Sequence, residues 1–275
     1  MTFLKSHGFF YALTCSADKY VSWFTWIKLS NTIAKKRLMQ LLSLVIPAYN
    51  EETRIYKTLC ECSQILNGKI NYEIIVVDDG STDGTLPMVQ RLSQQIDFLK
   101  VVALGKNYGK GRAVREGIRT ASGDIVVFLD SDGATNFTAI FDILDALKNY
   151  DCAIGSRYLK ASKARISLLR RLISRIFNVF VSILFGLKIQ DTQCGFKGFR
   201  ASTIKTVLDE LTIDRFAFDV ELLWRLSRKG YSIVEIPIEW EEKAGSKVSI
   251  IKHGFSMVKD LLLLRAREFF KRRAE

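Results

Sequence analysis

From Leu42 onward, short runs of apolar, mostly β-branched residues alternate with longer stretches whose apolar residues recur at helical spacing. The apolar runs are LSLVIP, YEIIVVDD, KVVALG and DIVVFLD, and each predicts a short buried parallel strand. Helices are predicted between them, over residues 51–66, 84–95 and 110–120. This alternation of strand and helix favours an open, doubly wound α/β sheet.

The second half of the chain follows a different pattern. A helix over 136–149 precedes the strand CAIGS, and a further helix over 216–229 precedes a single long strand, SIVEIPIEW. Two other helical stretches, 165–187 and 249–273, are both apolar and basic. We therefore divide the chain into a leader of residues 1–40, an α/β domain of residues 41–245, and a basic amphipathic C-terminal helix of residues 246–275.

The leader differs from the rest because it is rich in aromatic residues without a clear period. Two interpretations stay open: a membrane-interface segment, which Trp and Tyr favour, or a chain whose physiological start is Met39. No stretch predicts a transmembrane helix. The longest apolar run covers 176–187, whereas a span needs about 20 residues.

Composition narrows the class of protein. The chain of 275 residues is 48% hydrophobic and 25% charged, which excludes a disordered, collagen-like or coiled-coil protein. Its five cysteines are odd in number and form no CxxC pair, so a disulfide scaffold or structural zinc is not expected and a reducing, cytosolic environment fits best.

The formal net charge of +12 favours an anionic partner: nucleic acid, a substrate that carries phosphate, or an acidic membrane. Between Cys152 and Gln190 there are eight basic residues and no acidic one. This charge lies beside apolar runs, as in helices that bind membrane surfaces. No nucleic-acid motif accompanies it, so we do not expect a nucleic-acid partner.

Three polar motifs follow predicted strands. PAYNEE begins at Pro47, VDDGSTDGT begins at Val77, and LDSDGA begins at Leu129. In an open α/β sheet, ligands bind beyond the carboxyl ends of the strands, where all three motifs lie. Asp78 and Asp79 can accept hydrogen bonds from a base N–H and from ribose hydroxyls. In the same motif, Ser81 or Asp83 is expected only to cap the next helix. Asp130 and Asp132 supply the hard oxygen ligands that suit Mg²⁺ or Mn²⁺ bridging substrate phosphates.

The three motifs, in this order, resemble the GT-A nucleotide-diphospho-sugar glycosyltransferases of family 2. More narrowly, the chain resembles the dolichyl- or polyprenyl-phosphate β-glucosyltransferases, which are relatives of dolichyl-phosphate mannosyltransferase. The narrower resemblance rests on five further motifs and covers about Leu42 to Arg267: DGAT, GSR, DTQCGFK, FDVEL and GSKV. It implies a GT-A sheet with C-terminal amphipathic helices that lie at the membrane interface.

The resemblance also implies roles for individual residues. The nucleoside pocket would be lined by Pro47, Tyr49, Glu51 and Asp79, with Asp79 toward the base. Lys106 and Lys110 lie after the third strand and either reach phosphate or sugar or are ordinary surface lysines. Asp132 would contact the metal directly, and Asp130 would contact the metal or the ribose. Where the mannosyltransferase relatives can supply a Gln ligand, this chain has Ala134, so water is expected in its place.

An acceptor that is a phosphate monoester needs no general base, because its second pKa is about 6 and it is already ionised. It needs cations, and Arg binds phosphate through two hydrogen bonds. Arg157 is the first candidate, and it joins Asp132 as a catalytic residue. The secondary candidates, Arg170, Arg171 and Arg175, lie on the following helix, where binding to the membrane surface is the alternative role.

The sequence thus predicts a peripheral membrane glycosyltransferase on the cytoplasmic face. It would move glucose from UDP-glucose to a polyprenyl phosphate with inversion, using Mg²⁺ or Mn²⁺. Within enzymes, the alternative donors are GDP-mannose and UDP-N-acetylhexosamine. The alternative from another class is a non-catalytic protein that binds nucleotide sugar or membrane. The sequence assigns neither the oligomeric state nor the roles of Asp191 and Glu221.

Overall fold

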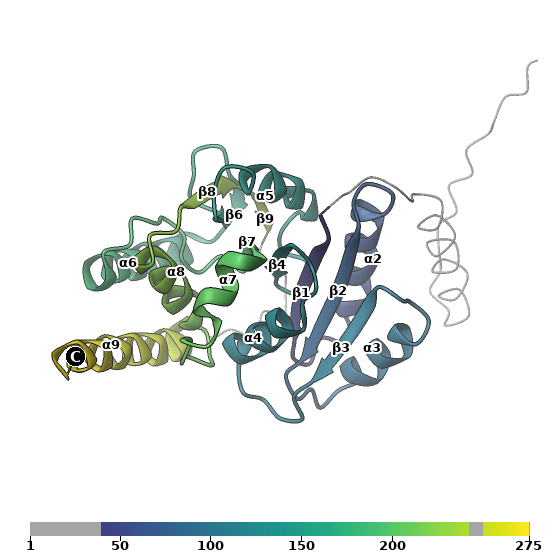
Figure 1. Ribbon diagram of the computed structural model, residues 1–275, viewed down its shortest axis with the longest axis horizontal. Helices are drawn as coiled ribbons and strands as arrows, with labels where there is room; N and C mark the ends of the chain where they lie inside the picture. The colour runs from purple at the N-terminus through teal and green to yellow at the C-terminus, as the bar shows by residue number, and fades with distance from the viewer. Residues whose placement is uncertain (1–39, 242–249, 275) are drawn as a thin grey trace, which may run out of the picture.

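The computed structural model describes residues 40–241 and 250–274. Figure 1 shows a central sheet with helices packed on it, the N-terminal half on the right and the C-terminal helices on the left. Within the described residues, seven strands form one sheet in the order β3-β2-β1-β4-β7-β5-β8. Their bounds are β1 Leu42–Ala48, β2 Tyr72–Asp78, β3 Leu99–Ala103, β4 Ile125–Leu129, β5 Cys152–Ser156, β7 Phe196–Arg200 and β8 Ile233–Pro237.

The helices cover both faces of this sheet. One apolar core lies between the sheet and α2, α3 and α5, and a second core lies between the sheet and α4, α6, α7, α8 and α9. Leu44 and Val45 of β1 are both fully buried, and they belong to opposite cores. The helices are α2 Ile55–Leu66, α3 Thr85–Ser93, α4 Lys110–Thr120, the 3₁₀ turn η1 Phe137–Ala139, α5 Ile140–Ala146, α6 Leu168–Phe185, α7 Ala201–Leu208, α8 Phe218–Arg228 and α9 Ile250–Ala274.

The sheet is mostly parallel but not entirely so. β1 pairs in parallel with β2 and β4, and β2 with β3, as predicted. β7 lies antiparallel between β4 and β5, and no strand was predicted at its position. Its fully buried Lys197 interrupts the apolar pattern, and the structure compensates this charge with Asp219 of α8. The strand is thus stabilised by a partner that is remote in sequence.

A second departure concerns the predicted strand SIVEIPIEW, which the structure divides into two. β8 belongs to the main sheet, whereas β9, Glu239–Glu241, pairs in parallel with β6, Lys163–Arg165, in a separate two-stranded sheet. Backbone hydrogen bonds join β9 to the loop after β4: Glu241 N donates to Ala134 O at 2.9 Å and Asn136 N donates to Glu239 O at 3.0 Å. This division brings Trp240 beside the Asp-x-Asp loop.

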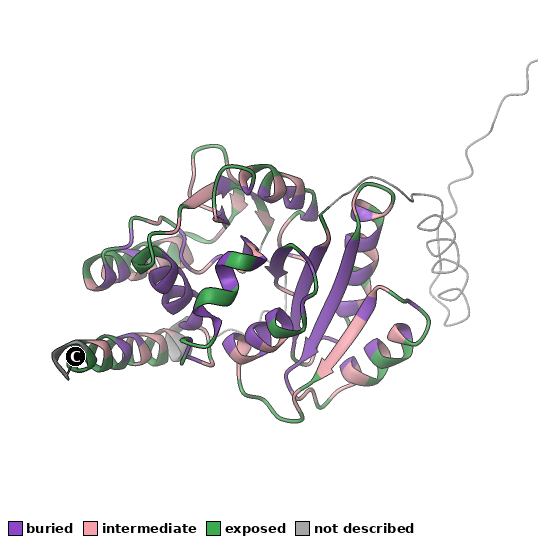
Figure 2. Cartoon of the chain, viewed as in Figure 1, coloured by how far each residue is buried: buried purple, intermediate pink, exposed green. Residues whose placement is uncertain are grey.

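Helix α6 was predicted over 165–187 and has clear boundaries. The Ser167 hydroxyl accepts from Arg170 N at its start, and Gly186, with a φ of 72°, ends it in the left-handed conformation. Much of its surface is exposed, as is that of α9 (Figure 2). Within residues 40–241 and 250–274, no helix combines the length and apolarity that a membrane span requires.

The predictions for the termini are tested only in part. The leader, the GSKV motif and the boundary proposed at residue 245 lie outside the described residues. A C-terminal helix is present as α9, and its Leu261 and Leu264 are buried while its Phe255 and Phe270 are exposed. An amphipathic, interfacial character for this helix stays a prediction.

Candidate active site

A cavity of about 570 Å³ lies beyond the carboxyl ends of β1, β2, β4 and β5. Each strand delivers one of the predicted side chains to its wall: Tyr49 after β1, Asp79 after β2, Asp130 after β4 and Arg157 after β5. Because the strand order is β2-β1-β4-β7-β5, Asp79 and Arg157 lie toward opposite ends of the cavity, with Asp130 between them.

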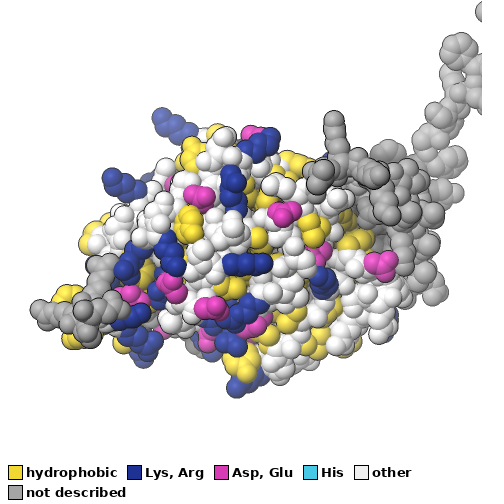
Figure 3. Space-filling view, in the orientation of Figure 1, with side chains coloured by type: hydrophobic (Ala, Val, Ile, Leu, Met, Phe, Trp, Pro, Cys, Tyr) yellow, Lys and Arg dark blue, Asp and Glu magenta, His cyan; other side chains and the backbone are white. Residues whose placement is uncertain are grey.

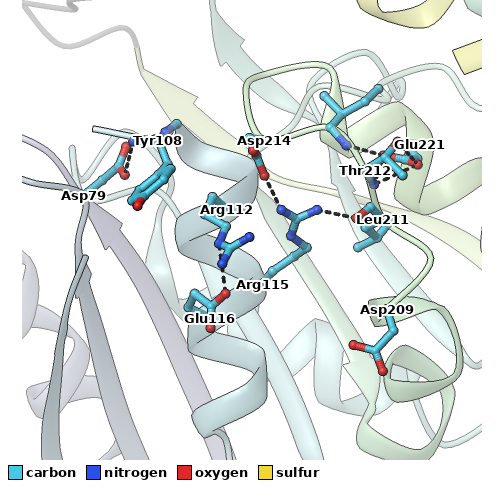
Figure 4. Close-up of polar contacts among 12 residues, drawn as sticks. Asp79, Tyr108, Arg112, Arg115, Glu116, Asp209, Leu211, Thr212, Asp214 and Glu221 are labelled. Carbon is cyan, nitrogen blue, oxygen red and sulfur yellow. Dashed lines mark hydrogen bonds and ion pairs between the residues drawn. The ribbon is translucent and has the colours of Figure 1, made fainter. Parts of the chain in front are cut away.

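The Asp79 end is held by the backbone after β3. Oδ1 of Asp79 accepts from Tyr108 N and Oδ2 accepts from Gly109 N, both at 2.8 Å (Figure 4). Burial raises the pKa of the Asp79 carboxyl, although these two hydrogen bonds oppose the shift. Gly109 has a φ of 118°, and a Cβ there would lie 2.7 Å from the Asp214 carbonyl. The backbone around Asp214 therefore lies too close to Gly109 for a residue with a side chain.

The loop over 209–217 forms the adjoining wall, and buried charges fix it. Arg115 of α4 donates to the Leu211 carbonyl and to Asp214, while Glu221 of α8 accepts from Thr212 N at 2.9 Å (Figure 4). Sequence reasoning left the role of Glu221 open. The structure shows that Glu221 is fully buried, lies outside the cavity lining and anchors this loop. The loop in turn places Arg215 and Phe216 in the cavity wall.

Two residues predicted to bind the nucleotide sugar lie outside the cavity lining. Asp78 is buried, and its Oδ2 accepts from Gly80 N at 3.1 Å and Ser81 N at 3.0 Å, so it shapes the turn after β2. Lys106 places its Nζ 4.8 Å from the centroid of the Tyr108 ring. Lys110, four positions later, lines the cavity.

The remaining predicted nucleoside residues do line the cavity. They are Pro47, Tyr49 and Glu51. The Glu51 carboxylate is paired with both Nε and Nη2 of Arg54, at 2.7 and 2.8 Å. This pairing balances the charge of Glu51 at the edge of the cavity.

The Asp-x-Asp pair lies at the middle of the cavity. Asp132 Oδ1 accepts from Ala134 N at 3.0 Å, and Asp130 Oδ1 lies 2.5 Å from the Nζ of Lys110. Burial and then the negative charge of Asp130 raise the pKa of the Asp132 carboxyl. Gly195 permits this arrangement, because a Cβ there would overlap the Asp130 carboxylate.

These residues fit a divalent cation. Among the described residues, no group of three or more His, Cys, Asp or Glu side chains gathers into a metal site. Asp130 and Asp132 provide two hard oxygen donors on a cavity wall, and their mutual repulsion favours a cation. Mg²⁺ is commonly held by one or two carboxylates together with substrate phosphates and water. Asp130 and Asp132 could hold such an ion in this way.

At the far end of the cavity, Arg157 is paired with Asp191. The Arg157 Nε and Nη2 donate to the two carboxylate oxygens at 2.7 and 2.8 Å, and the side chains are 9% and 0% exposed. Burial alone would lower the pKa of the guanidinium, but Asp191 raises it above its usual range. Asp191 thus compensates the charge of Arg157, and its own backbone N–H donates to Glu235 at 3.0 Å.

The three arginines of α6 differ in whether they line the cavity. Arg170 lines the cavity, with its Cζ 5.4 Å from the centroid of the Trp240 ring. Arg171 and Arg175 do not line the cavity. Cavity contacts from α6 include Phe177 and Asn178, so one side of this helix closes the site.

Comparison with known proteins identifies the family. Residues 43–208 match the family model described as glycosyl transferase family 2. The chain belongs to glycosyl transferase family 2. The enzyme class predicted from the motifs is thereby confirmed: the protein is a glycosyltransferase.

Curated relatives of this family 2 glycosyltransferase share much of its sequence. The dolichyl-phosphate β-glucosyltransferase of Dictyostelium discoideum is 36% identical over 242 residues, which cover 82% of this chain and 74% of that protein. The enzyme of the same name from Saccharomyces cerevisiae is 35% identical over 247 residues, with 82% and 74% covered. The Homo sapiens protein of that name is 37% identical over 243 residues, with 82% and 75% covered.

Solved structures confirm the GT-A fold. Glucosyl-3-phosphoglycerate synthase from Mycobacterium tuberculosis, in complex with Mn²⁺, UDP and glucosyl-3-phosphoglycerate, matches with a TM-score of 0.61 and 19% identity, covering 94% of this chain and 86% of that chain. The same enzyme in complex with Mg²⁺ and UDP matches with a TM-score of 0.60 and 20% identity, covering 89% and 83%.

Sequence reasoning missed several cavity residues of this glycosyltransferase. Arg215, Gln193 and Trp240 line the cavity. Arg215 and Gln193 follow no predicted strand, whereas Trp240 is the last residue of the predicted strand SIVEIPIEW. Gln193 belongs to the DTQCGFK motif and Trp240 ends a predicted strand, so both positions carried a usable signal. The roles of the predicted site residues stay proposals.

Proposed function

We propose that the protein transfers glucose from UDP-glucose to a polyprenyl phosphate of the dolichyl type, with inversion at the anomeric carbon. One observation carries this proposal: a single cavity has Asp79 toward one end, two arginines toward the other, and the Asp130–Asp132 pair between them. The curated relatives named dolichyl-phosphate β-glucosyltransferase support both the sugar and the acceptor.

The donor would lie along the β2, β1 and β4 side of the cavity. Pro47, Tyr49 and Asp79 line this side and would contact the nucleoside, and the acidic pair would hold Mg²⁺ or Mn²⁺ near the diphosphate. Such an ion offsets the negative charge that develops on the departing UDP. Lys110 lies at the same carboxylates and adds a positive charge beside the diphosphate.

The acceptor would enter from the β5 and α6 side. An oxygen of the phosphate monoester attacks the anomeric carbon, a new C–O bond forms, and the bond to UDP breaks on the opposite face. No base is required because the phosphate is already ionised at neutral pH. Arg157 and Arg170 line this side of the cavity and would neutralise the incoming phosphate.

The lipid tail of such an acceptor requires contact with a membrane surface. Helix α6 exposes a row of apolar side chains: Leu168, Leu169, Leu172, Ile176, Val179 and Ile183. Basic residues accompany them, and Lys and Arg lie mostly over the left and central parts of the face in Figure 3. An apolar, basic helix of this kind favours peripheral binding to an anionic membrane. Four described cysteines carry free thiols, which fits the cytoplasmic face.

The test is an assay of the purified protein with a panel of nucleotide sugars and a polyprenyl phosphate, with products separated by thin-layer chromatography. UDP-glucose is expected to yield a glucosylated lipid. Turnover only with GDP-mannose or UDP-N-acetylhexosamine would replace the donor in the proposal. Binding of UDP without turnover of any donor would instead favour a non-catalytic nucleotide-sugar-binding protein.

A further inference from the structure

Trp240 contacts two of the cavity arginines at once. The Cζ atoms of Arg157 and Arg170 each lie 5.4 Å from the centroid of its ring. This distance is within the range of about 6 Å over which a guanidinium is attracted to the face of an aromatic ring. Arg157 follows β5 and Arg170 belongs to α6, so the ring of Trp240 joins two elements that meet at the acceptor side of the cavity.

The backbone of Trp240 is fixed on both sides. It pairs with Ala164 of β6, and it forms an isolated bridge with Thr135 in the loop after Asp132. The neighbouring hydrogen bond from Glu241 N to Ala134 O, at 2.9 Å, holds the same loop. The ring therefore has a defined position relative to the Asp-x-Asp pair as well as to the two arginines.

The positive charges on the acceptor side of the cavity explain what an aromatic ring contributes there. Arg157 and Arg170 are both positively charged and share one ring, so each is favoured by negative charge nearby. Asp191 compensates Arg157 through two hydrogen bonds, at 2.7 and 2.8 Å, which also occupy Nε and Nη2. The ring of Trp240 offers its negative face to both cations without a carboxylate that would compete for phosphate.

We propose that Trp240 is a positioning residue for the acceptor-phosphate subsite, where its ring holds Arg157 and Arg170 at one wall of the cavity. This inference rests on the proposed function and adds a residue that does not itself contact the reacting atoms. The ligand that we assign to this subsite is a phosphate monoester with an apolar tail. We assign Trp240 no role at the donor end of the cavity, where Asp79 lies.

The test measures KM for donor and acceptor separately, with farnesyl phosphate in detergent as acceptor and UDP-glucose as donor. Trp240→Leu removes both ring contacts and is expected to raise the KM for farnesyl phosphate by about 10-fold or more. The KM for UDP-glucose should change by less than about 2-fold. Trp240→Phe keeps an aromatic face and should recover most of the loss, because Phe is the weaker but still effective partner.

Trp224 of α8 supplies a matched control. Its ring also contacts two guanidinium groups, those of Arg225 at 5.7 Å and Arg228 at 5.0 Å, but it lies outside the cavity lining. Trp224→Phe should leave the KM for farnesyl phosphate unchanged. If Trp240→Leu does not fold, the comparison of the two Phe variants decides: Trp240→Phe should still raise this KM by about 2- to 3-fold, because Phe is the weaker partner, and Trp224→Phe should not change it.

Direct binding separates this inference from the proposed function. Calorimetry with farnesyl phosphate and with farnesol measures the preference for phosphate without any turnover. A preference that is lost in Trp240→Leu supports the inference even if no donor is turned over, in which case the proposed function fails. A wild-type enzyme that transfers glucose, with equal phosphate preference in Trp240→Leu, overturns the inference alone. An equal rise in both KM values also overturns it.

Discussion

Asp191 accepts from both Nε and Nη2 of Arg157, although the two residues lie 34 positions apart in the chain. The backbone N–H of Arg157 donates to the same carboxylate at 2.9 Å. The pair of N–H donors on Nε and Nη2 that was expected to bind phosphate is therefore occupied by the Asp191 carboxylate. In the proposed acceptor subsite, Arg157 would therefore act by its charge and by its remaining N–H groups.

This arrangement predicts two effects of Arg157→Ala. The variant leaves the fully buried Asp191 without its partner, so the free energy of unfolding should fall by about 3–5 kcal/mol. Transfer should fall by at least about 100-fold, because a hydrogen bond to a charged group contributes about 1.5–3 kcal/mol and more in a dry site. Urea denaturation and the transfer assay measure the two effects on the same preparation.

UDP affinity separates the acceptor role of Arg157 from a donor role. Calorimetry should show nearly unchanged UDP binding by the folded variant. Arg157→Lys should recover only part of the transfer, because an ammonium keeps the charge but cannot reproduce both hydrogen bonds to Asp191. A collapse of UDP affinity would assign Arg157 to the donor site. Unchanged transfer would move the phosphate contact to Arg170.

The acidic pair predicts dependence on a divalent metal. Asp132→Ala should abolish transfer, and excess chelator should do the same to the wild type, since both remove the charge that offsets the departing diphosphate. Adding Mn²⁺ or Mg²⁺ back should restore the chelated wild type but not the variant. Near-normal turnover in excess chelator would exclude a metal role for Asp130 and Asp132.

Gly195 should be required for the geometry of Asp130. In Gly195→Ala the new methyl group would overlap the Asp130 carboxylate and force it away from Lys110 and Asp132. We expect transfer to fall by at least about 10-fold, with a matching loss of Mn²⁺ affinity, on the ground that misplacing a catalytic group is costly. Gly68→Ala is the control: its φ of 71° makes the substitution strain the backbone, but a Cβ there meets nothing within 4 Å and so displaces no side chain. Equal activity of the two variants would contradict this account.

Glu73 should make stability depend on pH. Burial alone would raise the pKa of its carboxyl, but contacts with Lys100, Ser43 and Ser122 outweigh burial and lower the pKa. The ionised group therefore stabilises the fold at neutral pH, and this contribution is lost as the pH falls below about 4.3, the usual value for Glu. Glu73→Gln should lower the free energy of unfolding by about 1.5–3 kcal/mol at pH 7. The difference from wild type should shrink in acid, and a difference independent of pH would show that the charge of Glu73 is not involved.

Helix α6 should mediate binding to anionic vesicles. Leu172 and Ile176 are 57% and 62% exposed, and replacing both with Glu adds negative charge and removes apolar area. We expect the bound fraction to fall by at least about 10-fold in a vesicle sedimentation assay, because binding scales with buried apolar area and with attraction to anionic lipids. Tyr150→Glu, which changes an exposed aromatic residue outside α6, should have little effect. A wild type that cannot be released by high salt or alkaline wash would indicate an integral segment instead.

The sequence alone was sufficient to predict the strands of the first half of the sheet and the acidic residues at the middle of the site. Strands β1 to β5 and helix α4 were predicted within one or two residues because each is a short apolar run or a regular amphipathic period, and such patterns depend only on neighbours along the chain. Asp79, Asp130 and Asp132 were predicted to meet because parallel strands end at one edge of a sheet.

Tertiary structure decided the features that depend on partners distant in sequence. The buried charge of Lys197 in β7 is compensated by Asp219, which reaches it from α8. Lys106 and Lys110 look alike in sequence, but only Lys110, the first residue of α4, lies in the cavity wall. The pairing of Arg157 with Asp191, and the turn of Trp240 out of the main sheet, follow from contacts that form only when the chain has folded. A local pattern of hydrophobic and polar residues does not predict contacts between residues that are distant in the chain.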